Sequence, residues 1–206
     1  MDKINTDLLH SFGDLPPDDY LRTAVPFRFR AFGPATMRDR KLDWTDDAQD
    51  FLQSEAINSY AGGRPRRFAP LSTAARVFAE RLVDDENLLP VPLGETVTVG
   101  CHQIRIVADD DFNGYPAPEG FHRDGFDWVV ITCVGQCNVN GGISMVSLPG
   151  AEQAGELLVE RSMAAGETMV LNDRAVRHYV SPITPKLPGR AHRDVIVLTF
   201  DGVRAA

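Results

Sequence analysis

The spacing of apolar residues changes near residue 95, from a helical period to short apolar runs separated by Gly and Pro. In the first half, Asp46 can cap a helix that ends at Gly62-Gly63. Ser72 can cap a second helix, whose apolar positions are Ala75, Val77, Phe78 and Leu82. Alternating residues over 27–32 predict a short edge strand before both. We therefore expect residues 1–95 to be largely helical and to pack on the second half.

The second half of the chain predicts one strand after another. The expected strands cover residues 96–108, 128–134, 142–148, 156–161, 167–172 and 194–200. Short strands separated by turn residues at this spacing are typical of a sandwich or jelly roll rather than of a parallel α/β sheet. We predict a mainly β fold with N-terminal helices, a double-stranded β-helix (cupin-like jelly roll). It forms a single domain over 1–206 with its core at 96–206, and the mouth of the barrel is the expected ligand pocket.

The composition restricts the classes of function. The chain has 206 residues, of which 43% are hydrophobic and 24% charged, as in a soluble globular domain. Its formal net charge of −8 disfavours a nucleic-acid partner, because such partners are bound by clustered Lys and Arg. The N-terminus lacks an apolar signal core, and the longest apolar run, 129–134, is too short to span a bilayer. We expect a cytoplasmic protein with no membrane partner, with Cys101, Cys133 and Cys137 as buried reduced thiols.

The segment Pro118–Gly125 carries the clearest indication of chemistry. In an extended segment, His122 and Asp124 point to the same face with their Cα atoms roughly 6.5 to 7 Å apart, which suits two ligands of one metal ion. The pair alone is weak, because a chain with five histidines contains His-x-Asp by chance almost as often as not. A second, distant histidine would complete the set of two His and one carboxylate that binds Fe(II) and leaves positions open for oxygen chemistry.

Four other histidines are candidates for the third ligand. His10 falls in the helical first half, His102 in the first long strand, and His192 just before the last strand. His178 lies between two extended stretches, and its separation from Asp124, 178 − 124 = 54 residues, leaves room for the intervening strands of a jelly roll. We therefore predict a metal site made of His122, Asp124 and His178.

Arg193 stands at the start of the last predicted strand. An arginine that enters a barrel strand is partly desolvated, and its planar guanidinium suits a bidentate carboxylate. A dicarboxylic 2-oxo acid that binds iron at one end would place its other carboxylate there. The alternative is a structural salt bridge with Asp194 or Asp201.

The first long strand carries two polar residues on a face that is otherwise apolar. Gln103 and Arg105 share that face with residues such as Val97, Val99 and Cys101. If the face points inward, a ligand could satisfy the two polar groups. An outward face or an internal salt bridge would satisfy them as well.

Together these residues resemble one family, the Fe(II)/2-oxoglutarate dioxygenases, and within it the bacterial free amino-acid hydroxylases of the L-isoleucine 4-hydroxylase type. The matching segments span about residues 100 to 200, whereas residues 1–95 match nothing recognisable. They are Gln103–Ile106, Pro118–Gly125, Asn138 with Gly141-Gly142, His178 with Val180 and Pro182, and Arg193–Phe200. One departure is Val195, because many relatives have Ser or Thr two residues after the arginine.

The resemblance implies a double-stranded β-helix that holds Fe(II) with His122, Asp124 and His178 and 2-oxoglutarate with Arg193. It implies O2-dependent hydroxylation of a free, aliphatic L-amino acid, with release of succinate and CO2. The substrate's carboxylate would need a cation, for which Arg105 is the candidate, and its ammonium an anion, for which Glu119 or Asp127 is the candidate. Gln103 is a further candidate for a substrate contact. Three alternatives remain: a carrier-bound or peptidyl substrate, a metal cupin enzyme without 2-oxoglutarate, and a cupin that only binds a small molecule.

Overall fold

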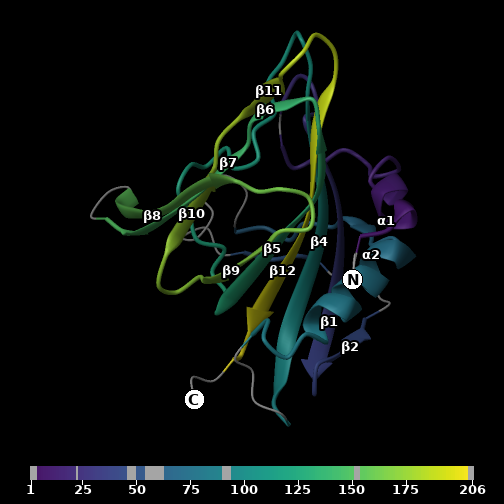
Figure 1. The fold of residues 1–206 in the computed structure, drawn as a ribbon. Coiled ribbons are helices and arrows are strands. Elements are labelled where there is room, and N and C mark those ends of the chain that lie inside the picture. Colours follow the sequence, from purple (N-terminus) through teal and green to yellow (C-terminus); the bar gives the residue numbers. More distant parts are fainter. Residues whose placement is uncertain are drawn as a thin grey trace.

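A seven-stranded sheet forms the larger layer of the fold (Figure 1). The computed structural model describes residues 4–21, 23–45, 50–53, 63–89, 94–150 and 154–203. The main path of the sheet runs β2-β1-β4-β12-β5-β9, and β3 pairs with β1 beside this path. The strands are β1 (Arg28–Arg38), β2 (Lys41–Trp44), β3 (Ala69–Pro70), β4 (Thr96–Ala108), β5 (Trp128–Cys137), β9 (Thr168–Asn172) and β12 (Ala191–Asp201).

The smaller layer contains a three-stranded sheet in the order β10-β7-β8 and a two-stranded piece, β11-β6. Figure 1 shows it on one side of the large sheet and the two helices on the other. The strands are β6 (Val139–Gly141), β7 (Ile143–Pro149), β8 (Ala154–Ser162), β10 (Arg177–Val180) and β11 (Ile183–Pro185). Two antiparallel layers confirm the predicted mainly β, jelly-roll architecture.

Two short helices cover one face of the large sheet. They are α1 (Thr6–Ser11), capped by Asn5, and α2 (Thr73–Val83), capped by Ser72 as the sequence predicts. Their apolar sides bury Phe12 and Phe78 in the main core, against residues of β4, β5 and β12. This packing fixes which face of the sheet is closed. Neither of these helices is long and apolar enough to cross a membrane, and the same holds for the rest of the described chain.

The N-terminal half contributes more strand than expected. The alternation over 27–32 belongs to β1, which pairs with β4 over its whole length and with β2 and β3, so it is not an edge strand. Most of β1 is buried, which removes the alternation that would have revealed its full extent. The helix predicted from Asp46 to Gly63 falls mainly outside the described residues. Within the described part, Phe51 forms an isolated bridge with Arg66.

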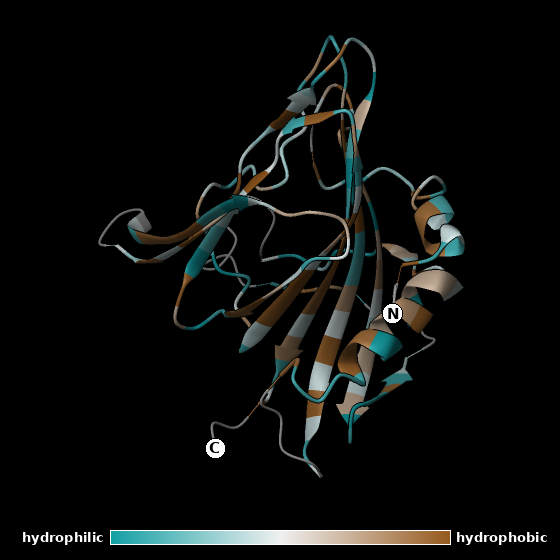
Figure 2. Ribbon diagram, in the orientation of Figure 1, coloured by the Kyte–Doolittle hydropathy of each residue, from teal (hydrophilic) through white to brown (hydrophobic). Residues whose placement is uncertain are grey.

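The face of the large sheet that points away from the helices lines a cavity. Side chains alternate along each strand, so His102, Ile104 and Ile106 of β4 point to this face. The paired strands add matching rows, in which Arg28 and Arg193 flank Ile106, and Arg30 and Val195 flank Ile104. Figure 2 shows that the central strands are mainly apolar over their lower part and more hydrophilic toward their upper ends.

The three cysteines are free thiols. Cys101 and Cys133 are buried in the large sheet, and burial raises the pKa of both thiols. Cys137 is exposed, contrary to expectation, because it ends β5 beyond the region that the core covers.

Candidate metal centre and adjoining cavity

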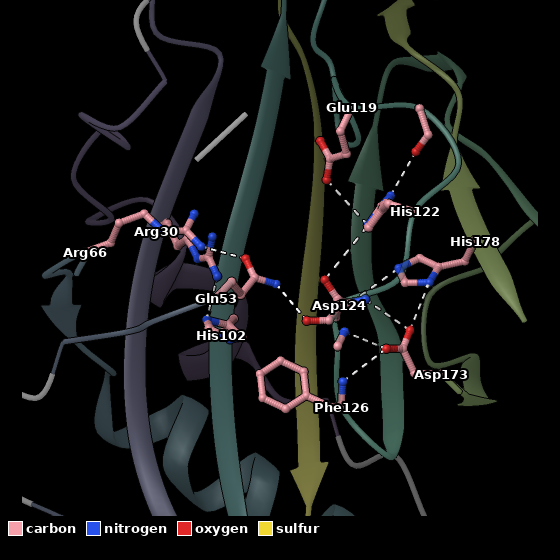
Figure 3. A network of polar contacts seen from close by, with 12 residues as sticks. Arg30, Gln53, Arg66, His102, Glu119, His122, Asp124, Phe126, Asp173 and His178 are labelled. Carbon is pink, nitrogen blue, oxygen red and sulfur yellow. Dashed lines mark hydrogen bonds and ion pairs between the residues drawn. The ribbon is translucent and has the colours of Figure 1, made fainter. Parts of the chain in front are cut away.

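The structure brings His122, Asp124 and His178 together at one side of the cavity (Figure 3). The loop between β4 and β5 carries His122 and Asp124, and β10 carries His178. Backbone hydrogen bonds join the loop to β10: the His122 amide donates to the His178 carbonyl at 3.0 Å, and the reverse bond measures 2.9 Å. This short antiparallel bridge is what places two distant histidines side by side.

The three side chains offer ligand atoms that lie within 4.8 Å of one another. Nε2 of His178 is 3.4 Å from Oδ2 of Asp124, and Nε2 of His122 is 3.9 Å from Oδ1. Two imidazoles and one carboxylate are the set that binds non-haem Fe(II) with open positions. The donor types and spacing therefore fit a single iron ion.

Groups around the three residues fix their orientation. Nδ1 of His122 lies 2.8 Å from the carbonyl oxygen of Gly120, so that nitrogen donates and Nε2 keeps its lone pair for a metal. The buried carboxylate of Asp173 accepts hydrogen bonds from the amides of Asp124, Gly125 and Phe126, at 3.1, 2.7 and 3.1 Å. Asp173 thus holds the backbone of the Asp124 turn in place.

The charges of the centre favour an ionised carboxylate. Burial alone would raise the pKa of Asp124, but the hydrogen bond and charge of His178 outweigh burial and lower it. Burial likewise would lower the pKa of His178, but Asp124 outweighs that effect and raises it. A metal ion that binds the imidazole of His178 would displace its proton.

Arg193 lies in the same cavity, which has a volume of about 120 Å³. Its side chain points inward from β12 and is buried, and Nε has no hydrogen-bond partner. Nη2 donates to the sulfur of Met163 at 4.0 Å. Burial lowers the pKa of this guanidinium, so an anion bound there would restore much of the lost stabilisation. Val195, next along the strand on this face, also lines the cavity.

Of the four residues considered for substrate contacts, only Glu119 lines the cavity. Its Oε1 lies 3.4 Å from Nε2 of His122. Asp127 is turned away: it accepts hydrogen bonds from the amides of Gly202 and Val203, at 2.8 and 2.9 Å, and pairs with Arg174.

Gln103 and Arg105 lie on the helix-covered face of β4, away from the cavity, so they are not substrate contacts and the alternative of an internal salt bridge applies to Arg105. Nε2 of Gln103 donates to Oγ of Ser11 at 2.8 Å, and Oε1 accepts from Oγ of Ser72 at 3.1 Å. Arg105 makes a bidentate pair with Asp194, both distances being 2.7 Å. Alternation identified the shared face, but the apolar residues on it belong to the core under the helices.

Sequence reasoning missed four other cationic or imidazole side chains of the cavity: Arg28, Arg30, Arg66 and His102. A signal was present, because Arg28 and Arg30 alternate with aromatic residues and therefore share one face of a strand. His102 had been considered as a metal ligand, but it is not among the three clustered ligands.

A protein-family model described as 2OG-Fe dioxygenase matches residues 9–199. The chain belongs to this family. Membership implies Fe(II), 2-oxoglutarate and O2, the groups for which the three clustered ligands and the buried guanidinium are chemically suited.

Two curated proteins and one solved structure are similar to this chain. The 3(1)-hydroxy-L-isoleucine 4-dioxygenase of Pantoea ananatis is 28% identical over 162 residues, which are 73% of this chain and 63% of the relative. The L-isoleucine-4-hydroxylase of Bacillus thuringiensis is 23% identical over 163 residues, 75% of this chain and 66% of the relative. The match thus spans slightly less than two thirds of each curated relative. A crystal structure of a bsmA homolog from Methylobium petroleophilum PM1 superposes with a TM-score of 0.78 at 29% identity, covering 97% of this chain and 82% of that one.

Proposed function

We propose that the protein is an Fe(II)- and 2-oxoglutarate-dependent dioxygenase that hydroxylates a free L-amino acid. The observation that carries the proposal is one cavity lined by both a cluster of two His and one Asp and a buried guanidinium with an unpartnered N–H. The two His and one Asp suit Fe(II), and the guanidinium suits a carboxylate of 2-oxoglutarate. Family membership implies the same cofactor and co-substrates.

The residues take the following roles in the proposal. His122, Asp124 and His178 hold the iron, and Arg193 binds the distal carboxylate of 2-oxoglutarate. When bound, the iron and 2-oxoglutarate would supply the oxidising chemistry, in which a C–H bond, O2 and 2-oxoglutarate give a C–OH bond, succinate and CO2. The protein contributes orientation and exclusion of water, and the apolar Ile104 and Val197 line the space between the polar groups.

The amino-acid class of substrate is supported by the names of the two curated relatives, which both concern isoleucine. An aliphatic side chain fits a cavity with several β-branched residues, among them Ile104, Ile131 and Val197. Glu119 is the carboxylate that we assign to the substrate's ammonium group, because it lines the cavity beside His122.

The test is turnover of the purified protein with Fe(II), O2 and 2-oxoglutarate against the twenty L-amino acids. We expect one or more to gain one oxygen in the mass spectrum, with an equal amount of succinate. His178→Ala should abolish both products, and His192→Ala, outside the cluster, should retain them. Full turnover by the His178 variant would show that the metal assignment is wrong.

A further inference from the structure

Two buried arginines of the cavity have no acidic partner among the residues that the structure describes. Arg30 points inward from β1, and Arg66 lies in the segment that bridges to Phe51. Their exposed fractions are only 8% and 1%. Within the described part of the chain, neither guanidinium has a carboxylate within ion-pairing distance, and Nε of each has no hydrogen-bond partner.

Two other arginines of β1 and β4, the buried Arg28 and the half-buried Arg105, show what such groups normally require. Arg28, one row along from Arg30, pairs with the buried Asp18 at 2.8 Å. Arg105 pairs with Asp194 through two bonds. A buried charge that lacks a counterion is strongly destabilising. Arg30 and Arg66 therefore differ from their neighbours in a way that a bound anion would explain.

The contacts that Arg30 and Arg66 do make leave their donor edges available. The Arg30 guanidinium carbon lies 4.5 Å from the ring centroid of Phe68, and that of Arg66 lies 4.9 Å from the centroid of Phe51. Stacking of this kind uses the face of a guanidinium and not its N–H groups. One further bond joins each to a neutral partner: Arg30 donates to Nδ1 of His102 at 2.8 Å, and Arg66 donates to Oε1 of Gln53 at 2.6 Å.

The partners add no negative charge. Burial, and then the charge of Arg30, keep the pKa of His102 well below its ordinary value, so the ring is neutral. Since Nδ1 accepts from Arg30, the proton of His102 sits on Nε2, which is a third buried donor with no partner. Burial and the charge of Arg28 also lower the pKa of both Arg30 and Arg66.

This group of donors is separate from Arg193. In the strand register, Arg30 of β1 lies opposite Ile104 of β4, and Arg193 of β12 lies opposite Ile106 on the other side of β4. The Cα atoms of the two arginines are therefore separated by two strand spacings across the sheet and two residues along it, or about 12 Å. The cavity thus has two cationic ends that suit two different anions.

We propose that Arg30 and Arg66 bind the free carboxylate of the substrate. This inference rests on the proposed function and deepens it, because an amino acid held by a carrier or within a peptide has no charged carboxylate to offer. It replaces Arg105 as the cation for that group.

The site also lies next to the metal centre. Figure 3 shows Gln53 between the two guanidinium groups and Asp124, with His122 and His178 beyond Asp124. Nε2 of Gln53 donates to the backbone carbonyl of Asp124 at 3.0 Å, while its Oε1 accepts from Arg66. Arg66 is thus two hydrogen bonds from the Asp124 turn, so a carboxylate bound to Arg66 would lie on the side of the cavity next to the metal centre.

The first test uses the wild-type protein and pairs each of the twenty L-amino acids with its carboxamide. The amide keeps the side chain and ammonium group but loses the negative charge. We expect kcat/KM for an accepted acid to exceed that for its amide by about 10- to 100-fold, the range of a hydrogen bond to a charged group. Equal use of acid and amide overturns the inference without any variant.

The second test uses Arg30→Met and Arg66→Met, with Arg67→Met as the matched control. Arg67 is the neighbour of Arg66 in the chain, but 66% of its side chain is exposed and it pairs with Asp50. The two cavity variants should lose most of the preference for the acid, because kcat/KM for the acid falls by about 10- to 100-fold. The control should behave as wild type. Retained preference in both cavity variants, or a raised KM for 2-oxoglutarate alone, contradicts the assignment.

A binding readout separates this inference from the proposed function. Without O2, the accepted acid should raise the melting temperature of the Fe(II)–2-oxoglutarate protein, and its amide should not. If a free acid is bound and oxidised but its amide raises the melting temperature equally, the carboxylate site is wrong and the proposed function stands. If 2-oxoglutarate does not bind at all, the proposed function itself fails.

Discussion

At the scale of single residues, the chemistry of the cavity follows from side chains that are buried with too few partners. The three clustered ligands were predictable because His and Asp two residues apart on an extended segment share a face, and one late histidine remained to join them. The surroundings of Gln103 and Arg105 were not predictable, because alternation separates the two faces of a strand without showing which face a ligand occupies. The arginines of β1 needed the strand pairing to reveal them.

Replacement of Arg193 by Met tests its proposed role. The lost bidentate pairing should raise KM for 2-oxoglutarate about 10- to 100-fold and leave binding of the amino acid unchanged. Arg193→Lys should recover part of the affinity, and the exposed Arg190→Met serves as control. Measured succinate release against 2-oxoglutarate concentration decides it. An unchanged KM in a folded Met variant would make Arg193 a structural residue.

Asp127→Asn tests a structural carboxylate. Burial would raise the pKa of Asp127, but the bonds from Arg174 and from the amides of Val203 and Gly202 outweigh burial and lower it. A carboxyl group whose pKa is lowered by folding stabilises the folded state at pH values above its unfolded-state pKa. This stabilisation is lost as the pH falls through the folded-state pKa. Asn should therefore lower the free energy of unfolding by about 1 kcal/mol at pH 7 and by progressively less below about pH 4. Urea titrations across pH measure this, and a difference independent of pH would rule out the charge as its cause.

At the scale of elements, the six predicted strands are all present, and β4 has the predicted bounds. The strands that the sequence did not predict are short. Strands of three or four residues, such as β6, β10 and β11, show too little alternation to be recognised. β10 nevertheless carries the metal ligand His178. This strand forms through long-range pairing with β7 and through the bridge between His178 and His122.

The pair of Arg105 and Asp194 joins β4 to β12 beneath the helices. Arg105→Met leaves Asp194, whose side chain is 2% exposed, without its main partner. The free energy of unfolding should fall by about 3 kcal/mol, measured in urea, with KM for the amino acid unchanged in the folded protein. Adding Asp194→Asn should restore part of the loss. A raised KM with intact stability would instead return Arg105 to the substrate site.

At the scale of the whole molecule, the two β layers place strands β1 and β12, which carry Arg30 and Arg193, opposite the loop and strand that carry the metal ligands (Figure 1). The jelly-roll class was predictable from the succession of short strands. The position of the cavity was not, because it depends on which face the helices close.

The visible absorption of the Fe(II) protein, when 2-oxoglutarate is added without oxygen, tests the iron and co-substrate assignment most simply. We expect a new charge-transfer band in the wild-type protein, absent in His178→Ala and requiring more 2-oxoglutarate in Arg193→Met. No band in a folded, iron-loaded wild-type protein would contradict it, as would a band of full intensity in the His178 variant.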